Sequence, residues 1–139
     1  MIFSKRGEYA IRALVHLARA RPVCGAREIS RGQDVPYHFI AKVLQELKAK
    51  GLVKSVRGAG GGFSLARPAE EVRLIEVLQA VEHDHFFDRC IYGFGNCSDN
   101  NPCSLHEGWK PIKETLEIYL NSHTIGDLVN PLAGSPNPQ

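Results

Sequence analysis

A mainly α-helical fold with one small β-hairpin is the architecture that the sequence predicts. Apolar residues recur at helical spacing in three segments, at about 5–20, 36–50 and 74–82. Two short strand-like segments, 52–56 and 63–66, flank a tip rich in glycine and so predict a hairpin. The chain of 139 residues shows no internal repeat, and its length corresponds to about one domain with a buried core.

The first helix is expected to begin after Ser4, whose side chain can cap it, and to run to about Ala20. Its core-facing residues are Ala10, Ala13, Leu14, Leu17 and Ala18. Pro22 and Gly25 then end the helical pattern. Cys24 lies between them, far from the other cysteines, and we expect it to be a buried or unreactive thiol.

The next two helices have the arrangement of a helix-turn-helix. A short helix at 26–31 precedes a turn at 32–35, and Pro36 suits the start of a longer helix that Gly51 ends. The apolar stripe of this longer helix is Phe39, Ile40, Val43, Leu44 and Leu47. Its outward face carries Tyr37, His38, Ala41, Lys42, Gln45 and Lys48. Two helices joined by a tight turn, with an exposed basic and aromatic face, are typical of DNA-binding proteins.

The predicted hairpin follows directly, with its glycine-rich tip at 57–62. No Gly-Lys-Ser/Thr follows these glycines and no helix begins there, so a nucleotide-binding loop is not indicated. A basic hairpin after a helix-turn-helix is the wing of a winged helix, where glycines allow close approach to DNA and an arginine can enter a minor groove. The predicted DNA contacts are therefore Tyr37, His38, Lys42, Gln45, Arg57 and Gly60.

Charge divides the chain into two halves. Residues 1–67 carry thirteen Lys/Arg against four Asp/Glu, a balance of +9, and residues 68–139 carry four against eleven, a balance of −7. A basic half beside an acidic half indicates a region that binds a polyanion, joined to a region with another task. No apolar run approaches the ~20 residues that span a membrane and no signal peptide opens the chain, so we expect a cytoplasmic protein without a membrane partner.

A short polar loop contains Cys90, Cys97, Cys103 and His106 within seventeen positions. Thiolate and imidazole ligands at this density indicate an iron–sulfur cluster or zinc. Glycines and an Asn/Asp/Pro run let the backbone wrap around an ion. From these residues alone, three readings stay open: an iron–sulfur cluster, a structural zinc with Cys3His ligation, or a metal-free thiol switch.

A further helix is expected after the loop. Ser104 to Glu107 has the form of a capping box, and Pro111 predicts a kink or a restart of the helix. Trp109, Ile112, Leu116 and Tyr119 form a seam that packs either against a partner helix or inside one subunit. One more helical turn is expected at 124–128. We divide the chain into a winged helix-turn-helix region at 1–67, a cluster-loop and dimerisation-helix region at 68–128, and a disordered tail at 129–139.

In this order, the helix-turn-helix, the wing at 56–63, the pair Arg67-Pro68 and the three-cysteine loop resemble the IscR/NsrR-type family of bacterial winged-helix transcription regulators. The resemblance covers about residues 1–128. It implies a homodimer that crosses long helices, binds a palindromic operator and holds one iron–sulfur cluster per subunit. The presence or oxidation state of that cluster would set promoter choice or release the DNA.

The resemblance also implies a ligand set. Cys90, Cys97 and Cys103 match the three cluster cysteines, and His106 matches the histidine ligand of the iron–sulfur-biogenesis regulators. Glu8 lies where the nitric-oxide-sensing members have a carboxylate supplied by the first helix of the other subunit. We favour His106 over Glu8 as the fourth ligand. We also favour a two-iron (2Fe-2S) cluster over a four-iron (4Fe-4S) cluster.

The predicted function is therefore that of a DNA-binding transcription regulator, acting as a repressor, whose cluster senses redox state, nitric oxide or iron supply. A winged-helix regulator with a structural zinc or a metal-free thiol switch in the loop is the alternative. No oxyanion or substrate constellation accompanies Cys103 and His106, so an enzyme is not indicated.

Overall fold

The computed structural model of the chain describes residues 3–20, 22–82, 87, 90, 92, 95, 98–100 and 102–129. In chain order its elements are α1 (Lys5–Arg19), α2 (Ala26–Gln33), α3 (Tyr37–Ala49), β1 (Val53–Val56), β2 (Gly62–Leu65), the 3-10 turn η1 (Ala69–Glu71), α4 (Leu74–Val81), α5 (His106–Ser122) and α6 (Ile125–Val129). The predicted fold class, mainly helical with one antiparallel hairpin, is confirmed. Within these residues, no helix combines the length and apolar content that crossing a membrane requires.

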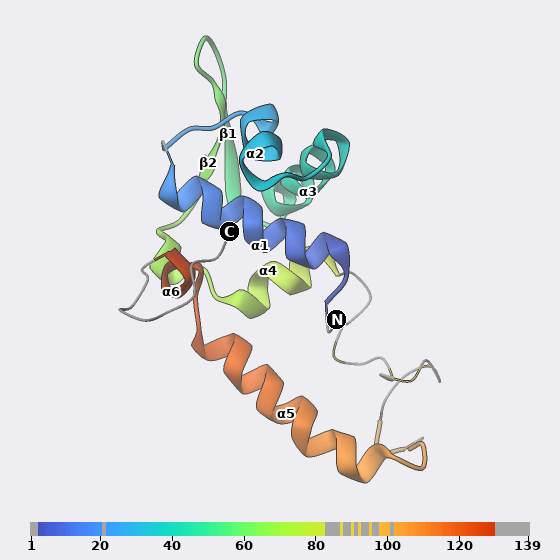
Figure 1. Cartoon of the computed structure of the whole chain (residues 1–139). Coiled ribbons are helices and arrows are strands. Elements are labelled where there is room, and N and C mark those ends of the chain that lie inside the picture. Colours follow the sequence, from blue (N-terminus) through green and yellow to red (C-terminus); the bar gives the residue numbers. More distant parts are fainter. Residues whose placement is uncertain are drawn as a thin grey trace.

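Helix α1 crosses the middle of the molecule and packs against α2, α3, α4 and α6 (Figure 1). Its predicted core face is confirmed at four buried positions, Ala10, Ala13, Leu14 and Leu17. Ala18 is only half-buried, at the edge of this face. The surrounding helices add the buried residues Ile40, Val43, Leu44, Leu47, Val77, Leu78 and Val81. Because the alanines of α1 are small, the neighbouring helices approach it closely.

The helix ends follow local sequence signals. The Oγ atom of Ser4 accepts a hydrogen bond from the Gly7 N–H at 3.3 Å, so the predicted cap of α1 is confirmed. Pro36 is the N-terminal cap of α3 rather than its first helical residue. Gly51 follows this helix with a φ of 76°, which glycine adopts without the steric cost of a Cβ atom.

The prediction that Phe39 belongs to the core stripe of α3 is wrong, because its side chain is 43% exposed. It precedes the buried Ile40 by one residue, or about 100° around the helix, and this places it at the margin of the apolar stripe. Its ring lies near two other rings instead, 5.9 Å from that of Tyr9 and 4.4 Å from that of His38. Spacing alone does not reveal the width of the buried stripe.

Strands β1 and β2 form the predicted wing, with Val53 opposite Leu65 and Val56 opposite Gly62. The wing is attached to the segment before α2 by two backbone hydrogen bonds that Cys24 and Phe63 exchange, at 2.9 and 2.8 Å. A Cβ atom on Gly62 would lie 2.5 Å from the carbonyl oxygen of Cys24. Glycine at position 62 is therefore required by the close approach of the wing to this segment.

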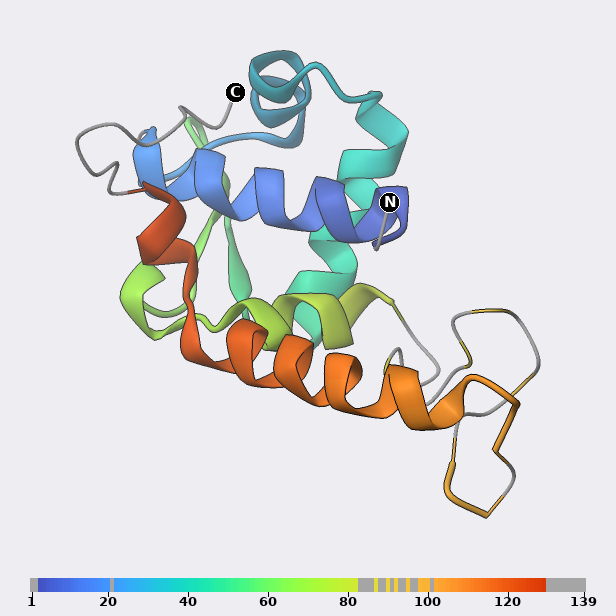
Figure 2. The ribbon, with the colours of Figure 1, turned by 60° about the horizontal axis from the view of Figure 1, so that its bottom comes forward.

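Helix α5 runs along one side of the molecule as one unbroken helix (Figure 2). The predicted capping box is wrong, since α5 begins after Leu105 and no side chain caps it. The predicted restart at Pro111 is also absent from this helix. Pro111 is the sixth residue of α5, so it removes only the hydrogen bond to the carbonyl of Glu107, in the first turn.

The chain returns to the body after α5. The backbones of Arg73 and Thr124 form an isolated bridge, and the Ile125 N–H donates to the Val72 carbonyl at 2.8 Å. The predicted turn at 124–128 is confirmed as helix α6. The tail was predicted to begin at residue 129, but Val129 is the last residue of α6. Residues 130–139 lie outside the described residues, so their disorder stays a prediction.

Candidate nucleic-acid interface and metal centre

The exposed face of α3 and the wing lie at the same end of the molecule, opposite α5 (Figure 1). All six predicted DNA contacts are exposed: Tyr37, His38, Lys42 and Gln45 on α3, and Arg57 and Gly60 on the wing. At the tip, the Gly61 N–H donates to the Gly58 carbonyl at 2.9 Å, and Gly60 has a φ of 76°. The wing tip is thus a tight glycine turn with a basic residue beside it.

Sequence reasoning missed the partner of Tyr37. The guanidinium carbon of Arg27, from α2, lies 4.3 Å above the centre of the Tyr37 ring, which is a cation–π contact. Tyr37 is nonetheless 42% exposed. The contact orients an aromatic ring at the start of α3 and adds the guanidinium of Arg27 to the cations of this surface. Residues ten apart on two different helices share no periodicity that would have indicated the pair.

A series of polar contacts joins the start of α1 to both α3 and α4. The Ser4 N–H and the Ser4 hydroxyl donate to Oε1 of Glu82 at 3.1 and 2.7 Å. Glu82 caps the end of α4, immediately before the segment that leads into the cysteine loop. Two residues further along the chain from Ser4, Arg6 forms an ion pair with Glu46 of α3. The end of α4 is therefore connected through α1 to the helix that carries the candidate DNA contacts.

In the cysteine loop, Cys90 and Cys103 are half-buried, and Cys97 lies outside the described residues. The Tyr92 N–H donates to Sγ of Cys90 at 3.4 Å, and the Cys90 N–H donates to the Gly95 carbonyl at 2.7 Å. N–H donors to a cysteine sulfur stabilise its thiolate form, which is the form that ligates metals. Among the described residues, the donor atoms of Cys90, Cys103 and His106 do not all meet within 4.8 Å.

His106 is only 3% exposed, although it begins α5 beside a polar loop. Its Nε2 atom lies 2.8 Å from Oδ1 of Asp99, and Nζ of Lys110 donates to the two Asp99 oxygens at 3.1 and 3.0 Å. Hydrogen bonds from His106 and then Lys110 hold the pKa of the Asp99 carboxyl below its usual value, so Asp99 is a carboxylate at neutral pH. Sequence reasoning did not identify Asp99 or Lys110.

This arrangement fits a metal-ligating histidine. Such a histidine usually turns one ring nitrogen to a carboxylate, which fixes the tautomer and presents the other nitrogen to the metal. Here Nε2 of His106 faces Asp99, so Nδ1 is the nitrogen suited to ligation. The donor set of the loop, thiolates with a braced imidazole, therefore suits an iron–sulfur cluster or zinc.

The alternative ligand Glu8 lies on α1, with its side chain 26% exposed. Its carboxylate is 3.7 Å from Nζ of Lys5, one turn earlier on the helix. Lys5 is 71% exposed and this long pair contributes little to stability. Oε2 of Glu8 is nevertheless buried with no hydrogen-bond partner among the described residues, so Glu8 stays the alternative ligand.

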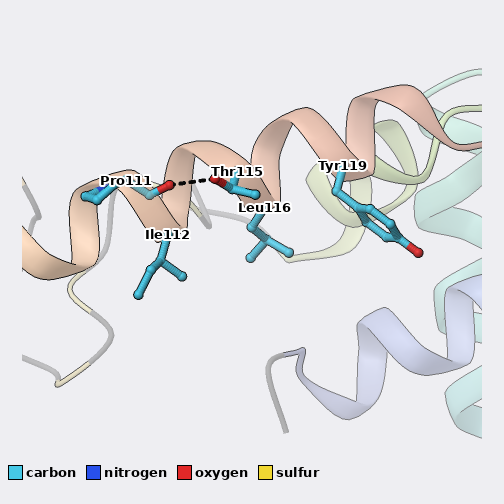
Figure 3. A pocket seen from close by; sticks show the side chains of 5 residues that line it. All are labelled: Pro111, Ile112, Thr115, Leu116 and Tyr119. Atoms are coloured by element: carbon cyan, nitrogen blue, oxygen red, sulfur yellow. Dashed lines mark hydrogen bonds between the residues drawn. The ribbon is translucent and has the colours of Figure 1, made fainter.

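One face of α5 is apolar and open. Pro111, Ile112, Thr115, Leu116 and Tyr119 line a shallow groove, and Ile112, Leu116 and Tyr119 project from the same side of the helix (Figure 3). Ile112 is 57% exposed and Tyr119 is 56% exposed, while Leu116 is half-buried against the core. Ile112 and Tyr119 of the predicted seam are therefore not core within this chain.

These features define a class of protein. A helix-turn-helix followed by an attached wing, with basic and aromatic residues exposed on both, is the structure of a winged-helix DNA-binding protein. Residues 3–131 match the Rrf2 family, which is described as iron-dependent transcriptional regulators. The match spans most of the chain, so this protein belongs to the Rrf2 family. It is a transcription regulator and not an enzyme.

Individual relatives agree with this assignment. The HTH-type transcriptional regulator IscR of Escherichia coli K12 is 35% identical over 133 residues, which cover 94% of this chain and 81% of IscR. The structure of CymR, the global cysteine regulator of B. subtilis, has a TM-score of 0.76 at 22% identity and covers 91% of this chain and 95% of CymR. The structure of T. potens IscR has a TM-score of 0.71 at 23% identity and covers 91% of this chain and 84% of that chain. The two structures share the fold.

Proposed function

We propose that this protein is a cytoplasmic, homodimeric repressor whose affinity for its operator is set by an iron–sulfur cluster bound at Cys90, Cys97, Cys103 and His106. The observation that carries the proposal is the buried imidazole of His106, which is hydrogen-bonded to Asp99 and lies at the end of a three-cysteine loop. The 35% identity to a regulator named IscR supports the same reading. A two-iron cluster fits this mixed ligand set.

A bound cluster would supply a centre whose stability and charge change with oxidant, nitric oxide or iron supply. The ligands from the protein decide how labile that centre is, because replacing a thiolate by an imidazole changes the reduction potential. No distant part of the chain has to become ordered to bring His106 close to Cys103. It lies three residues after Cys103, and its backbone N–H donates to the Cys103 carbonyl at 3.1 Å. This local geometry favours His106 over Glu8 as the fourth ligand.

The operator is proposed to be palindromic and read by two copies of α3. Two recognition helices must reach successive major grooves about 34 Å apart, which a monomer cannot do. The open face of α5, with Ile112 and Tyr119 more than half exposed, is an apolar surface that would pack against the same face of the second copy. Within each copy, α3 would lie in the major groove and Arg57 on the wing would enter the flanking minor groove.

The contacts at the start of α1 would carry a structural change from the cysteine loop to the DNA-binding helix α3. A change in the cysteine loop would alter the position of Glu82, which holds Ser4 by two hydrogen bonds. α1 would carry this change to α3 through the Arg6–Glu46 ion pair. Each link is a contact between neighbouring elements, which is how a small shift at one end would reach the other.

Anaerobic purification with absorption and Mössbauer spectra, together with counts of iron, sulfide and zinc per chain, tests this proposal. We expect a brown protein with iron and sulfide in equal amounts. A colourless protein with one zinc per chain would replace the cluster by a structural zinc site. Colourless, metal-free protein with a reducible disulfide in the loop would make the loop a thiol switch.

The fourth ligand is tested by comparing His106→Ala with Glu8→Ala. We expect the histidine change to abolish or shift the cluster absorption and the reduction potential, and the glutamate change to leave both intact. His123→Ala is the matched control, since His123 follows the other end of α5. If the spectra survive the loss of His106 and collapse with the loss of Glu8, the carboxylate is the ligand.

A further inference from the structure

A second group of metal-ligating side chains lies far from the cysteine loop, in the DNA-binding half. His16 of α1, Cys24 before α2 and Glu28 of α2 each offer one donor atom, and these three atoms all lie within 4.8 Å of one another. Cys24 is fully buried, and His16 and Glu28 are half-buried. The three donors, thiolate, imidazole and carboxylate, are the ligand types that zinc and neighbouring divalent ions take.

The imidazole of His16 is positioned as a ligand. Its Nδ1 atom lies 3.3 Å from the side-chain amide of Gln33, and its Nε2 atom is buried with no hydrogen-bond partner among the described residues. A buried nitrogen without a partner is costly, and a metal ion would satisfy it. Flipping the Gln33 amide turns its oxygen to Nδ1, which would then donate, and this leaves the Nε2 lone pair available to a metal.

Gly32 makes this position of the ring sterically feasible. A Cβ atom at residue 32 would lie 2.5 Å from Cε1 and 2.9 Å from Nδ1 of His16. The ring therefore lies directly against the backbone of α2, beside the donor atoms of Cys24 and Glu28. Preorganisation of this kind lowers the cost of forming a metal site.

The spacing of the three donors also suits an ion. For three atoms that are no more than 4.8 Å apart, a point always exists that lies within about 2.8 Å of all three. Zinc bonds to sulfur, nitrogen and oxygen are about 2.0–2.3 Å long, so the donor atoms need to move inward by at most about 0.5–0.8 Å. Three protein ligands would leave the fourth tetrahedral position to water.

We propose that His16, Cys24 and Glu28 bind one divalent transition-metal ion, of which Zn²⁺ is the representative, at a site separate from the cysteine loop. Binding replaces the thiol proton of Cys24, which is released to solvent, by a bond from sulfur to the metal. The ion joins α1, α2 and the segment that carries the wing, because the Cys24 backbone is hydrogen-bonded to Phe63 of β2. Metal at this site therefore holds the wing in a fixed position relative to the helix-turn-helix.

The test uses the full chain with Cys90→Ser, Cys97→Ser and Cys103→Ser, so that the loop cannot bind metal. We expect this background protein to take up one Co²⁺ or Zn²⁺ per chain, with a sulfur-to-cobalt charge-transfer band, and to gain thermal stability on adding Zn²⁺. Adding Glu28→Gln or His16→Gln should weaken binding by more than about a hundredfold, because loss of a ligand costs more than loss of a supporting group.

Glu71→Gln and His123→Gln are the matched controls, since they make the same chemical changes outside the group, and they should bind metal as the background does. Cys24→Ser should remove the charge-transfer band. Circular dichroism of each protein establishes that it is folded, and Glu28→Gln changes a residue that is not fully buried. Background protein that is folded and takes up no metal would overturn the proposal. Equal binding by the ligand variants and the controls would also overturn it.

Discussion

The two ends of the molecule differ in how fully their apolar side chains are buried within one chain. The end formed by α2, α3 and the wing packs on a shared core with α1, and its residues 1–67 carry a balance of +9. The opposite end consists of the cysteine loop and α5, which packs chiefly against α4 and leaves an apolar face open. The DNA-binding end is thus folded on a hydrophobic core that one chain supplies. We propose that the other end is completed by a metal group at the cysteine loop and by a second chain on α5.

The largest effect is expected from charging the open face of α5. Ile112→Glu should give monomers and lower operator affinity by at least about a hundredfold, because the two half-sites are no longer bound together. Ile112 is the better position for this test, since Leu116→Glu would also disturb the core that Leu116 contacts. Light scattering and operator binding measure both effects.

Ser122→Glu adds the same charge to α5 at an exposed position outside the groove, and should stay dimeric. An Ile112→Glu protein that remains dimeric would mean that the second chain does not pack on this face.

Removing the brace on His106 should have the next largest effect. Asp99→Ala takes away the carboxylate at Nε2 of His106, and supporting groups of this kind contribute about 10–100-fold to metal affinity. We expect the cluster absorption to decay correspondingly faster when a chelator is added. Glu107→Ala removes a neighbouring exposed acid and is the control. Equal decay rates for Asp99→Ala and the control would show that Asp99 does not support a ligand.

At the DNA-binding end, Arg57→Ala should weaken operator binding by about 1–3 kcal/mol and relax the preference at flanking A·T steps. The log–log dependence of binding on salt should have a slope of about −0.9 per phosphate neutralised, and the variant should lose about one such contact. Lys54→Ala removes one positive charge from β1 of the same hairpin and is the control. It distinguishes the loss of a specific contact at the tip from the general loss of positive charge. Binding that ignores salt would contradict the assignment of this surface to DNA.

The smallest effect is expected at the connection between the two ends. Glu82→Gln weakens the hydrogen bonds from Ser4, and such exposed contacts contribute only about 1 kcal/mol. The variant should keep its cluster spectrum, while the ratio of operator affinities with and without the cluster falls a few fold. Glu71→Gln, an exposed acid on η1, should leave that ratio unchanged. An unchanged ratio in Glu82→Gln would place the signal route elsewhere.

The sequence predicted most of the fold because the fold depends on periodic and local signals. Helical spacing located α1, α3 and α4, and glycine at 51 and in the tip located the end of α3 and the wing. The errors occurred where a residue lies at the margin of a pattern. Phe39 is next to the core stripe, and Ser104 lies too early in the chain to cap α5.

The candidate site could be predicted only in part, for a related physical reason. The cysteines and His106 are close in sequence, so their density was visible. Asp99 contacts His106 across a loop, Glu82 contacts Ser4 over 78 positions, and Cys24 meets His16 only because α1 and α2 pack together. No repeat or spacing marks contacts of this kind, since they depend on how the elements fold against one another.

Operator binding by the cluster-loaded and the cluster-free dimer, measured anaerobically in the same buffer, tests the central claim most directly. The claim that the cluster controls DNA binding predicts affinities that differ by about 5–150-fold, the range usual for coupling between two sites. The difference should disappear in His106→Ala, which should bind DNA as the cluster-free protein does. Equal affinities for the loaded and cluster-free wild-type dimers would contradict the account.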